Sequence, residues 1–184
     1  FDRHIDKIKR IKNHNKIDYV SIASPNYLHD SHARFALRSG AHAICEKPLV
    51  LNPWNIDGLN EIESDTGHKI YTILQLRLHP AIITLREKVK AALPSKKYDL
   101  DLTYITSRGH WYLQSWKGDV NKSGGIATNI GVHFYDMLYF VFGAVQSNVL
   151  HYCSNMKAAG MVASGEFFEY VNFNDWLYGT TNEQ

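Results

Sequence analysis

The sequence of 184 residues contains only two cysteines, Cys45 and Cys153, and neither lies in a CxxC or Cys/His spacing. This scarcity argues against a disulfide framework and against a zinc site, so we expect no metal and a reducing, cytoplasmic location. The sequence also lacks an apolar run approaching the ~20 residues of a membrane span, and its first residues do not form a signal peptide. We therefore expect no membrane partner.

An excess of positive charge is missing as well. Lysine and arginine number 20 against 18 acidic residues, and they are spread along the chain, so no continuous basic stripe is available for nucleic acid. Hydrophobic residues make up 45% of the chain, which is enough to bury a core. The composition is that of a globular protein that does not bind nucleic acid.

What is present in the first 78 residues is an alternation of short apolar strands and amphipathic helices. Such an alternation predicts a parallel sheet with helical crossovers. The GxGxxG turn that holds a dinucleotide pyrophosphate is absent. We therefore expect the second half of a Rossmann-type sheet. The expected strands are 18–23, 41–45 and 69–75, and the expected helices are 5–13, 29–39 and one from Asn52-Pro53 to Gly67.

Beyond residue 78 the pattern changes to period two, at 99–106, 149–152 and 166–173, which is typical of antiparallel strands with one exposed face. Helices are expected at 82–93 and 132–142. The predicted fold class is thus α/β followed by α+β: residues 1–78 belong to a dinucleotide-binding domain, and residues 79–184 to an α+β domain with an open antiparallel sheet. We interpret both chain ends as cuts.

Two polar loops follow neighbouring strands, at the sheet edge where ligands bind in open α/β folds. Glu46-Lys47-Pro48 follows one strand, and its lysine can donate to a substrate hydroxyl. Ser24-Pro25-Asn26, with His29, follows the other and can line a nicotinamide ribose. Taken alone, each segment is equally compatible with an ordinary solvated turn.

A glycine-rich stretch carries the second candidate group. Ser123-Gly124-Gly125 leads through Asn129 and Gly131 to His133, which lies in the first turn of the expected helix and can accept a proton near neutral pH. Asp136, three residues later, can orient its ring. The alternative is a half-buried histidine that caps its own helix.

Three further residues belong to the candidate ligand-binding set. Arg77 follows the third strand and can reach a carboxylate or phosphate, although it is also compatible with a plain surface arginine. Trp116 and Lys117 offer an aromatic plane beside a cation, which suits a sugar or a nucleotide. The aromatic run 110–112 is interpreted as core.

Taken in order, Ala-Ser-Pro-Asn, Glu-Lys-Pro, Gly-Gly and Asn129-x-Gly131-x-His133-x-x-Asp136 resemble the Gfo/Idh/MocA oxidoreductases. The resemblance implies NAD as cofactor, with NADP not excluded, bound by Ser24, Pro25, Asn26, His29, Glu46, Lys47 and Trp116. It implies that Lys47 and His133 flank the hydroxyl being oxidised. The family usually has aspartate at Asn129, so which of the two is the base stays open.

The segments 74–80 and 127–133 resemble the branch that oxidises C3 of UDP-N-acetylglucosaminuronic acid in surface-polysaccharide synthesis. This resemblance implies a nucleotide-sugar substrate held by Lys47, Arg77, Lys117, Asn129 and His133. It also implies a homo-oligomer, a dimer or tetramer formed through the antiparallel sheet.

Three alternatives remain at this stage. The chain can be a truncated remnant without activity, another sugar or inositol dehydrogenase of the family, or a sugar-binding module on the same fold. Because the pyrophosphate-binding turn is missing from the sequence, we expect these 184 residues alone to be inactive.

Overall fold

The computed structural model describes residues 3–4, 17–93, 96–104 and 110–145. The chain divides into two compact units. We call residues 1–74 with 121–124 the sheet unit, and residues 75–120 with 125–184 the helix unit. Each is described by itself below.

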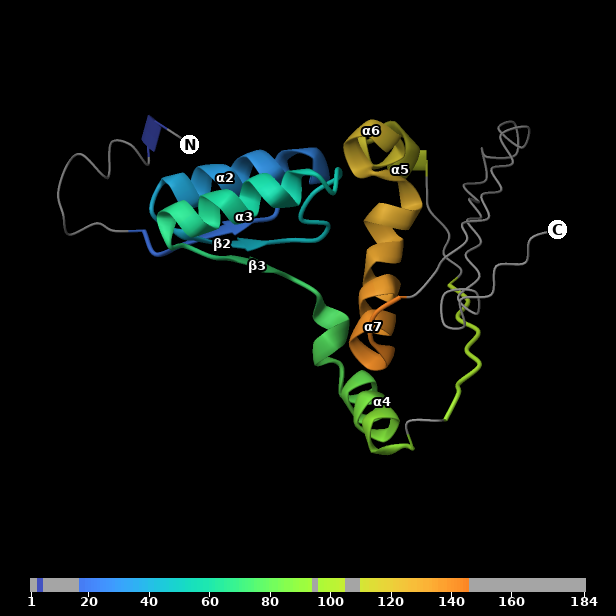
Figure 1. Ribbon diagram of the computed structural model, residues 1–184. Coiled ribbons are helices and arrows are strands. Elements are labelled where there is room, and N and C mark those ends of the chain that lie inside the picture. Colours follow the sequence, from blue (N-terminus) through green and yellow to red (C-terminus); the bar gives the residue numbers. More distant parts are fainter. Residues whose placement is uncertain (1–2, 5–16, 94–95, 105–109, 146–184) are drawn as a thin grey trace. The chain divides into compact units, whose positions relative to one another are not determined.

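The sheet unit contains three parallel strands in the order β1-β2-β3, as the alternation of strands and helices predicted. Helices α2 and α3 connect them and lie side by side along the sheet (Figure 1). Right-handed crossovers between successive parallel strands place consecutive helices on the same face, which accounts for this arrangement. The bounds are β1 Tyr19–Ile22, α2 His29–Arg38, β2 His42–Cys45, α3 Asn55–Thr66 and β3 Ile70–Thr72, with a short 3-10 turn η1 at Asn26–Leu28.

Alternation along the strands determines which side chains enter the core. In β1, Val20 and Ile22 are buried whereas Tyr19 is 57% exposed. In β2 the buried positions are Ala43 and Cys45. Small and medium side chains from the helices complete this core; they are Ala33, Ala36 and Leu59. The helices can approach the sheet closely because so many of these residues are alanines.

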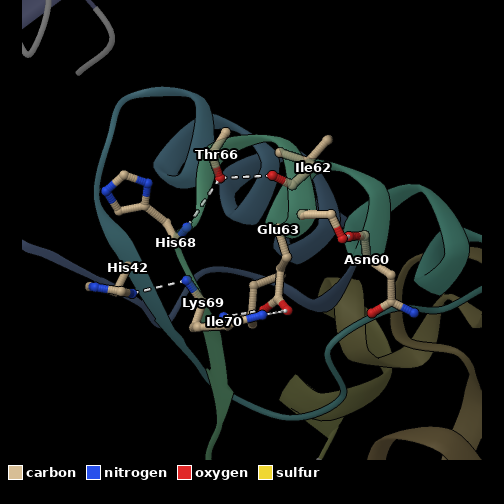
Figure 2. A network of polar contacts seen from close by, with 9 residues as sticks. His42, Asn60, Ile62, Glu63, Thr66, His68, Lys69 and Ile70 are labelled. Carbon is tan, nitrogen blue, oxygen red and sulfur yellow. Dashed lines mark hydrogen bonds and ion pairs between the residues drawn. The ribbon is translucent and has the colours of Figure 1, made fainter.

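The start of β3 is secured by side chains from two other elements (Figure 2). The Glu63 carboxylate accepts hydrogen bonds from the Ile70 backbone N–H at 2.6 Å and from Lys69 Nζ at 3.1 Å. The Lys69 backbone N–H donates to Nδ1 of His42 at 2.9 Å. These contacts extend the pairing between β2 and β3 beyond the strand ladder and fix the register of β3.

The start of α3 differs from the expectation. Asn52 does not cap this helix; its side-chain oxygen accepts a hydrogen bond from the Trp54 backbone N–H in a preceding turn, and α3 begins at Asn55. An Asx-type turn competes here with the helix cap that Asn-Pro suggests. Helix α2 ends at Arg38, one residue before the expected end, and Gly40 follows with φ 76°, a left-handed conformation that glycine adopts without strain.

The helix unit is built around α7 (Val132–Phe142), whose bounds equal the predicted ones. Helix α4 (Pro80–Ala91) and the 3-10 turn η2 (Gln75–Leu78) pack against it. A π-helical turn, η4 (Ala127–Gly131), leads directly into α7 where a glycine loop was expected. The remaining elements are α5 (His110–Gln114), η3 (Trp116–Gly118) and α6 (Val120–Ser123), of which residues 121–123 belong to the sheet unit.

The segment 99–106 was expected to be a strand, and its described part, 99–104, is not one. A strand requires a hydrogen-bonded neighbour, and the expected partners, 149–152 and 166–173, lie outside the described residues, as does the helix expected at 5–13. The period-two pattern nevertheless has a physical basis. Leu100 and Leu102 pack on the α7 cluster, and the Tyr104 ring lies 4.8 Å from that of Phe134.

Within the described residues, every helix is too short or too polar to cross a membrane.

Candidate functional site

The two candidate loops of the sheet unit lie next to each other at the carboxyl edge of the sheet. Parallel pairing of β1 with β2 aligns Ile22 with Cys45, so both strands end at the same level. The Glu46 backbone N–H donates to the Ile22 carbonyl at 2.9 Å. Lys47, half-buried, follows at once, and its peptide bond to Pro48 is cis.

His29 ties these loops together. Its side chain is 1% exposed, with Nδ1 2.7 Å from the Pro48 carbonyl oxygen and Nε2 2.7 Å from the Ser24 carbonyl oxygen. A neutral imidazole can donate from only one nitrogen, whereas an imidazolium donates from both. These contacts make His29 a brace between the loops; that it also touches a cofactor stays a prediction.

Asn26 is likewise engaged with the protein. Its Nδ2 donates to the Ser123 carbonyl at 2.9 Å, and both residues are buried. Gly124 and Gly125 follow with φ 81° and 75°, where a side chain would strain the backbone. The Asn26 amide therefore anchors the start of the glycine pair, a role that the sequence did not reveal because the two residues are 97 positions apart.

The other residues of the two loops have the chemistry to line one end of a dinucleotide. Ser24, Pro25, Glu46 and Lys47 are all half-buried, so they can meet a ligand without being part of the core. Ser24 Oγ lies 3.0 Å from Nδ1 of His32. Hydroxyl, carboxylate and ammonium groups suit a ribose and a nicotinamide amide. Because the chain has no GxGxxG turn, it offers no pyrophosphate cradle of that kind.

In the helix unit, His133 is the second residue of α7, as expected. Its Nδ1 is buried. The preceding π-helical turn makes the chain helical before Val132, so this end of α7 is not an open helix N-terminus. Single π-helical turns are frequent at functional sites. Gly131 is needed there for packing, since a Cβ at this position would lie 2.8 Å from the Tyr135 ring.

Asn129 lies inside the π-helical turn and is 6% exposed. Its Nδ2 donates to the Tyr112 hydroxyl at 3.2 Å. Tyr112 is 4% exposed, as the core interpretation of that aromatic run predicted, whereas Trp111 is 57% exposed and does not belong to the core. The tyrosine hydroxyl as a partner of Asn129 was missed, because no local sequence signal links α5 to the π-helical turn.

Arg77 forms a bidentate ion pair with Asp136. Arg77 Nε lies 3.1 and 2.8 Å from the two carboxylate oxygens of Asp136, and Nη2 makes a third hydrogen bond. The hydrogen bond to Asp136 raises the pKa of Arg77 further above its ordinary value. The sequence placed Arg77 on a ligand and Asp136 beside His133; the described hydrogen bonds of both side chains are with each other.

A second arginine, Arg86, was not anticipated. Its Nε donates to the Phe140 carbonyl at 3.0 Å, and its guanidinium lies 4.1 Å from the Phe140 ring centroid. Arg77 lies 5.3 Å from the same ring. Arg86 lies in the middle of α4, and nothing in the neighbouring sequence distinguishes it from a solvent-exposed arginine.

Trp116 and Lys117 lie together in η3. Lys117 Nζ is 5.7 Å from the Trp116 ring centroid and 5.2 Å from that of Trp111. This geometry is a cation–π arrangement, as the sequence suggested. Their contacts with cofactor and substrate stay predictions.

The structure thus assembles two groups. Ser24, Asn26, His29 and Lys47 come together in the sheet unit, and Arg77, Asp136, Asn129 and Tyr112 form pairs in the helix unit.

Parallel strands with polar loops at their carboxyl edge are the plan of a nucleotide-binding sheet. Family comparison makes this specific: residues 3–73 match the oxidoreductase family with an NAD-binding Rossmann fold, and residues 96–178 match its C-terminal α/β domain. The chain belongs to the Gfo/Idh/MocA oxidoreductase family, and its first domain is of the NAD-binding type.

The chain is also similar to individual oxidoreductases. D-glucoside 3-dehydrogenase of Escherichia coli is 32% identical over 90% of this chain and 48% of its own length. The WlbA (WbpB) dehydrogenase of Thermus thermophilus, crystallised with NAD and UDP-GlcNAcA, is 46% identical, with a TM-score of 0.74 over 82% of this chain and 48% of its own. The Bordetella pertussis WlbA dehydrogenase, at 20% identity and a TM-score of 0.70 over 76% of this chain and 42% of its own, shares the fold. The chain thus spans about half the length of these relatives.

Proposed function

We propose that the protein oxidises the C3 hydroxyl of UDP-N-acetylglucosaminuronic acid with NAD. The observation that carries the proposal is the 46% identity to the Thermus thermophilus dehydrogenase that binds NAD and UDP-GlcNAcA. Lys47 of Glu46-Lys47-Pro48 and His133, which the resemblance to the family places beside the reacting hydroxyl, support it. The product is a 3-keto nucleotide sugar, which suits a later amination in surface-polysaccharide synthesis.

Each residue has a proposed task. Bound NAD would supply the acceptor for the hydride that leaves the sugar carbon. An imidazole nitrogen of His133 takes the hydroxyl proton, and Lys47 Nζ donates a hydrogen bond to the same oxygen. Neutral histidine is the better base, because an unperturbed lysine, with a pKa of about 10.4, is nearly all protonated at pH 7.

Turnover by the full-length gene product tests the proposal. NADH formation is followed with UDP-N-acetylglucosaminuronic acid, and with UDP-N-acetylglucosamine as a control that differs only at C6. We expect kcat/KM to favour the uronic acid by at least ~10²-fold, because the neutral sugar cannot form the charge-assisted hydrogen bonds that a carboxylate accepts. Equal turnover of both sugars would contradict the proposed substrate.

A second candidate has support of its own. The 32% identity to D-glucoside 3-dehydrogenase favours oxidation of a free glucoside at the same carbon. Turnover of a methyl glucoside without any UDP-sugar turnover would select this candidate. Absence of NADH formation with glucosides, inositols and UDP-sugars alike would instead favour an inactive remnant.

A further inference from the structure

The ion pair between Arg77 and Asp136 joins η2 to α7, the helix that carries the proposed base. Asp136 follows His133 by three positions in α7, so the two side chains share one helix face with Cβ atoms about 5–6 Å apart. The Asp136 side chain is only 11% exposed, and that of Arg77 is 38% exposed. A carboxylate that is this buried requires a partner, and Arg77 is its partner here.

A second arginine contacts α7 one turn after Asp136. Phe140 is four positions after Asp136; Arg86 of α4 donates to its carbonyl at 3.0 Å and lies 4.1 Å from its ring centroid. Two arginines from two neighbouring elements thus hold α7 at successive turns. This fixes the rotation of α7 about its axis, and with it the direction of the residue at position 133.

Several ionisable groups lie on the elements packed on α7. The π-helical turn has no ionisable residue, η2 brings Arg77, and α4 brings Arg86, with Glu87, Lys88 and Lys90 towards its end. The segment 99–104, whose Leu100 and Leu102 pack on the Leu138 cluster, brings Tyr104 and the exposed side chains of Asp99 and Asp101. On α7 itself, Asp136 is the acidic residue. Because Arg77 neutralises this carboxylate at close range, His133 is three positions from a compensated pair and not from a bare negative charge.

We propose that Arg77 is a positioning residue: it binds Asp136 to fix α7 and to shield His133 from the carboxylate, in place of holding the substrate carboxylate directly. This inference rests on the proposed function, in which His133 is the base. Arg77 reaches the substrate only through Asp136 and α7, so its removal should change catalysis on all substrates alike.

The test compares Arg77→Gln, Asp136→Asn and the double variant of the full-length protein. Arg77→Gln leaves a bare carboxylate near His133, so the acidic limb of the pH–kcat profile should shift up by about 0.5–1 pH unit, as expected for one charge at ~6 Å in a partly solvated site. Asp136→Asn leaves the Arg77 guanidinium unpaired and should shift the acidic limb to lower pH. The double variant should restore the wild-type limb.

Kinetic constants distinguish positioning from binding. We expect both single variants to lower kcat by ~3–30-fold and to change KM by less than ~3-fold for charged and neutral sugars alike. Arg77→Lys keeps the charge without the planar fork, so the pH limb should be restored while kcat stays reduced. An unshifted limb in Arg77→Gln, together with a ~100-fold rise in KM for the uronic acid alone, would overturn the proposal in favour of direct substrate binding.

Arg86→Gln is the matched control, since Arg86 also holds α7 but does not pair with Asp136. It should lower kcat without the upward shift of the pH limb. NMR titration of the His133 ring in the same variants gives a readout that needs no turnover. The wild-type protein can turn over no UDP-sugar while the His133 titration still shifts up in Arg77→Gln and down in Asp136→Asn; in that case the proposed function fails and the shielding by Arg77 stands. If the His133 titration is unchanged in both single variants, the inference is overturned.

Discussion

In the sheet unit, hydrogen bonds from buried side chains to backbone carbonyls hold the candidate loops in place, whereas in the helix unit an ion pair and cation–π contacts hold α7. His29 lies between the Ser24 and Pro48 carbonyls, 1% exposed. Arg77, by contrast, is 38% exposed where it pairs with Asp136. The first arrangement is shielded from water and the second is partly open to it.

The difference bears on what each unit can tolerate. A buried hydrogen bond to a backbone carbonyl is costly to break, because the carbonyl is then left without a partner. A partly exposed ion pair is screened by salt and contributes less to stability. We therefore expect substitution of His29 to act mainly on stability, and substitution of Arg77 or Asp136 to act mainly on catalysis.

The largest expected effect concerns His133. In the full-length protein, His133→Asn should lower kcat by ~10²–10⁴ with little change in KM, the usual result of removing a general base. Steady-state kinetics at neutral pH measure it. Lys47→Gln is the matching variant in the sheet unit. If His133→Asn keeps its kcat and Lys47→Gln removes the acidic limb of the pH–kcat profile, then Lys47 is the base.

Truncation of one core leucine in each unit compares their packing. Leu59 is 2% exposed in a core of eight buried residues, whereas Leu138 is the one buried residue of its cluster within the described part of the chain. We expect Leu59→Ala to lower the free energy of unfolding by ~3–5 kcal/mol and Leu138→Ala by ~2–3 kcal/mol, because looser surroundings collapse more readily. Denaturant titration measures both.

Leu78, which is 78% exposed, serves as the control for these truncations. Leu78→Ala should change stability by no more than ~0.5 kcal/mol. A larger loss for Leu138→Ala than for Leu59→Ala would reverse the ranking of the two cores.

A pair of histidines on α2 tests the buried brace. His29→Leu removes the ring nitrogens that lie 2.7 Å from the Ser24 and Pro48 carbonyl oxygens and should lower the free energy of unfolding by ~2–4 kcal/mol. His32 is exposed and contacts only the Ser24 hydroxyl among the described contacts, so His32→Leu should cost less than ~1 kcal/mol. Urea titration measures the free energy of unfolding of both variants. Equal losses in His29→Leu and His32→Leu would show that the contacts of His29 do not stabilise the sheet unit.

Much of the sheet unit could be predicted from the sequence, because its signals are local. The apolar run 18–23 predicted β1, Gly40 follows the predicted helix 29–39, and the position of Lys47 after β2 followed from the parallel order. The start of α3 was misplaced because Asn52 can serve either a turn or a helix cap, and local sequence does not decide between them.

The contacts of the helix unit could not be predicted in the same way. Arg77 and Asp136 are 59 positions apart, and Tyr112 and Asn129 are 17 apart. Sequence reasoning found both residues of the ion pair but assigned Arg77 to a ligand and Asp136 to the His133 ring, since an arginine at a sheet edge looks the same whether its partner is a substrate or a side chain. The π-helical turn has no composition signal that separates it from a glycine loop.

Cys45 gives the smallest effect and tests how well the sheet core excludes water. Burial, with a smaller contribution from the charge of Glu46, raises the pKa of the Cys45 thiol to about 12. Only about 10⁻⁴ of it is then thiolate at pH 8, and the thiolate is the nucleophile. Iodoacetamide should leave Cys45 unmodified in the native protein and modify it in urea, as peptide mass spectrometry can show separately from Cys153.

The same shift predicts the sign of a pH dependence. Above pH ~8.5 the thiol ionises in the unfolded chain but stays protonated in the folded one, so the native state binds more protons and stability falls as pH rises towards 12. At pH 9 the loss should be below ~1 kcal/mol. Cys45→Ala should remove this slope between pH 8 and 10, whatever its effect on stability at pH 7. If instead Cys45 is alkylated in the native protein as fast as in urea, then the sheet core opens to solvent and the contrast between the two units disappears.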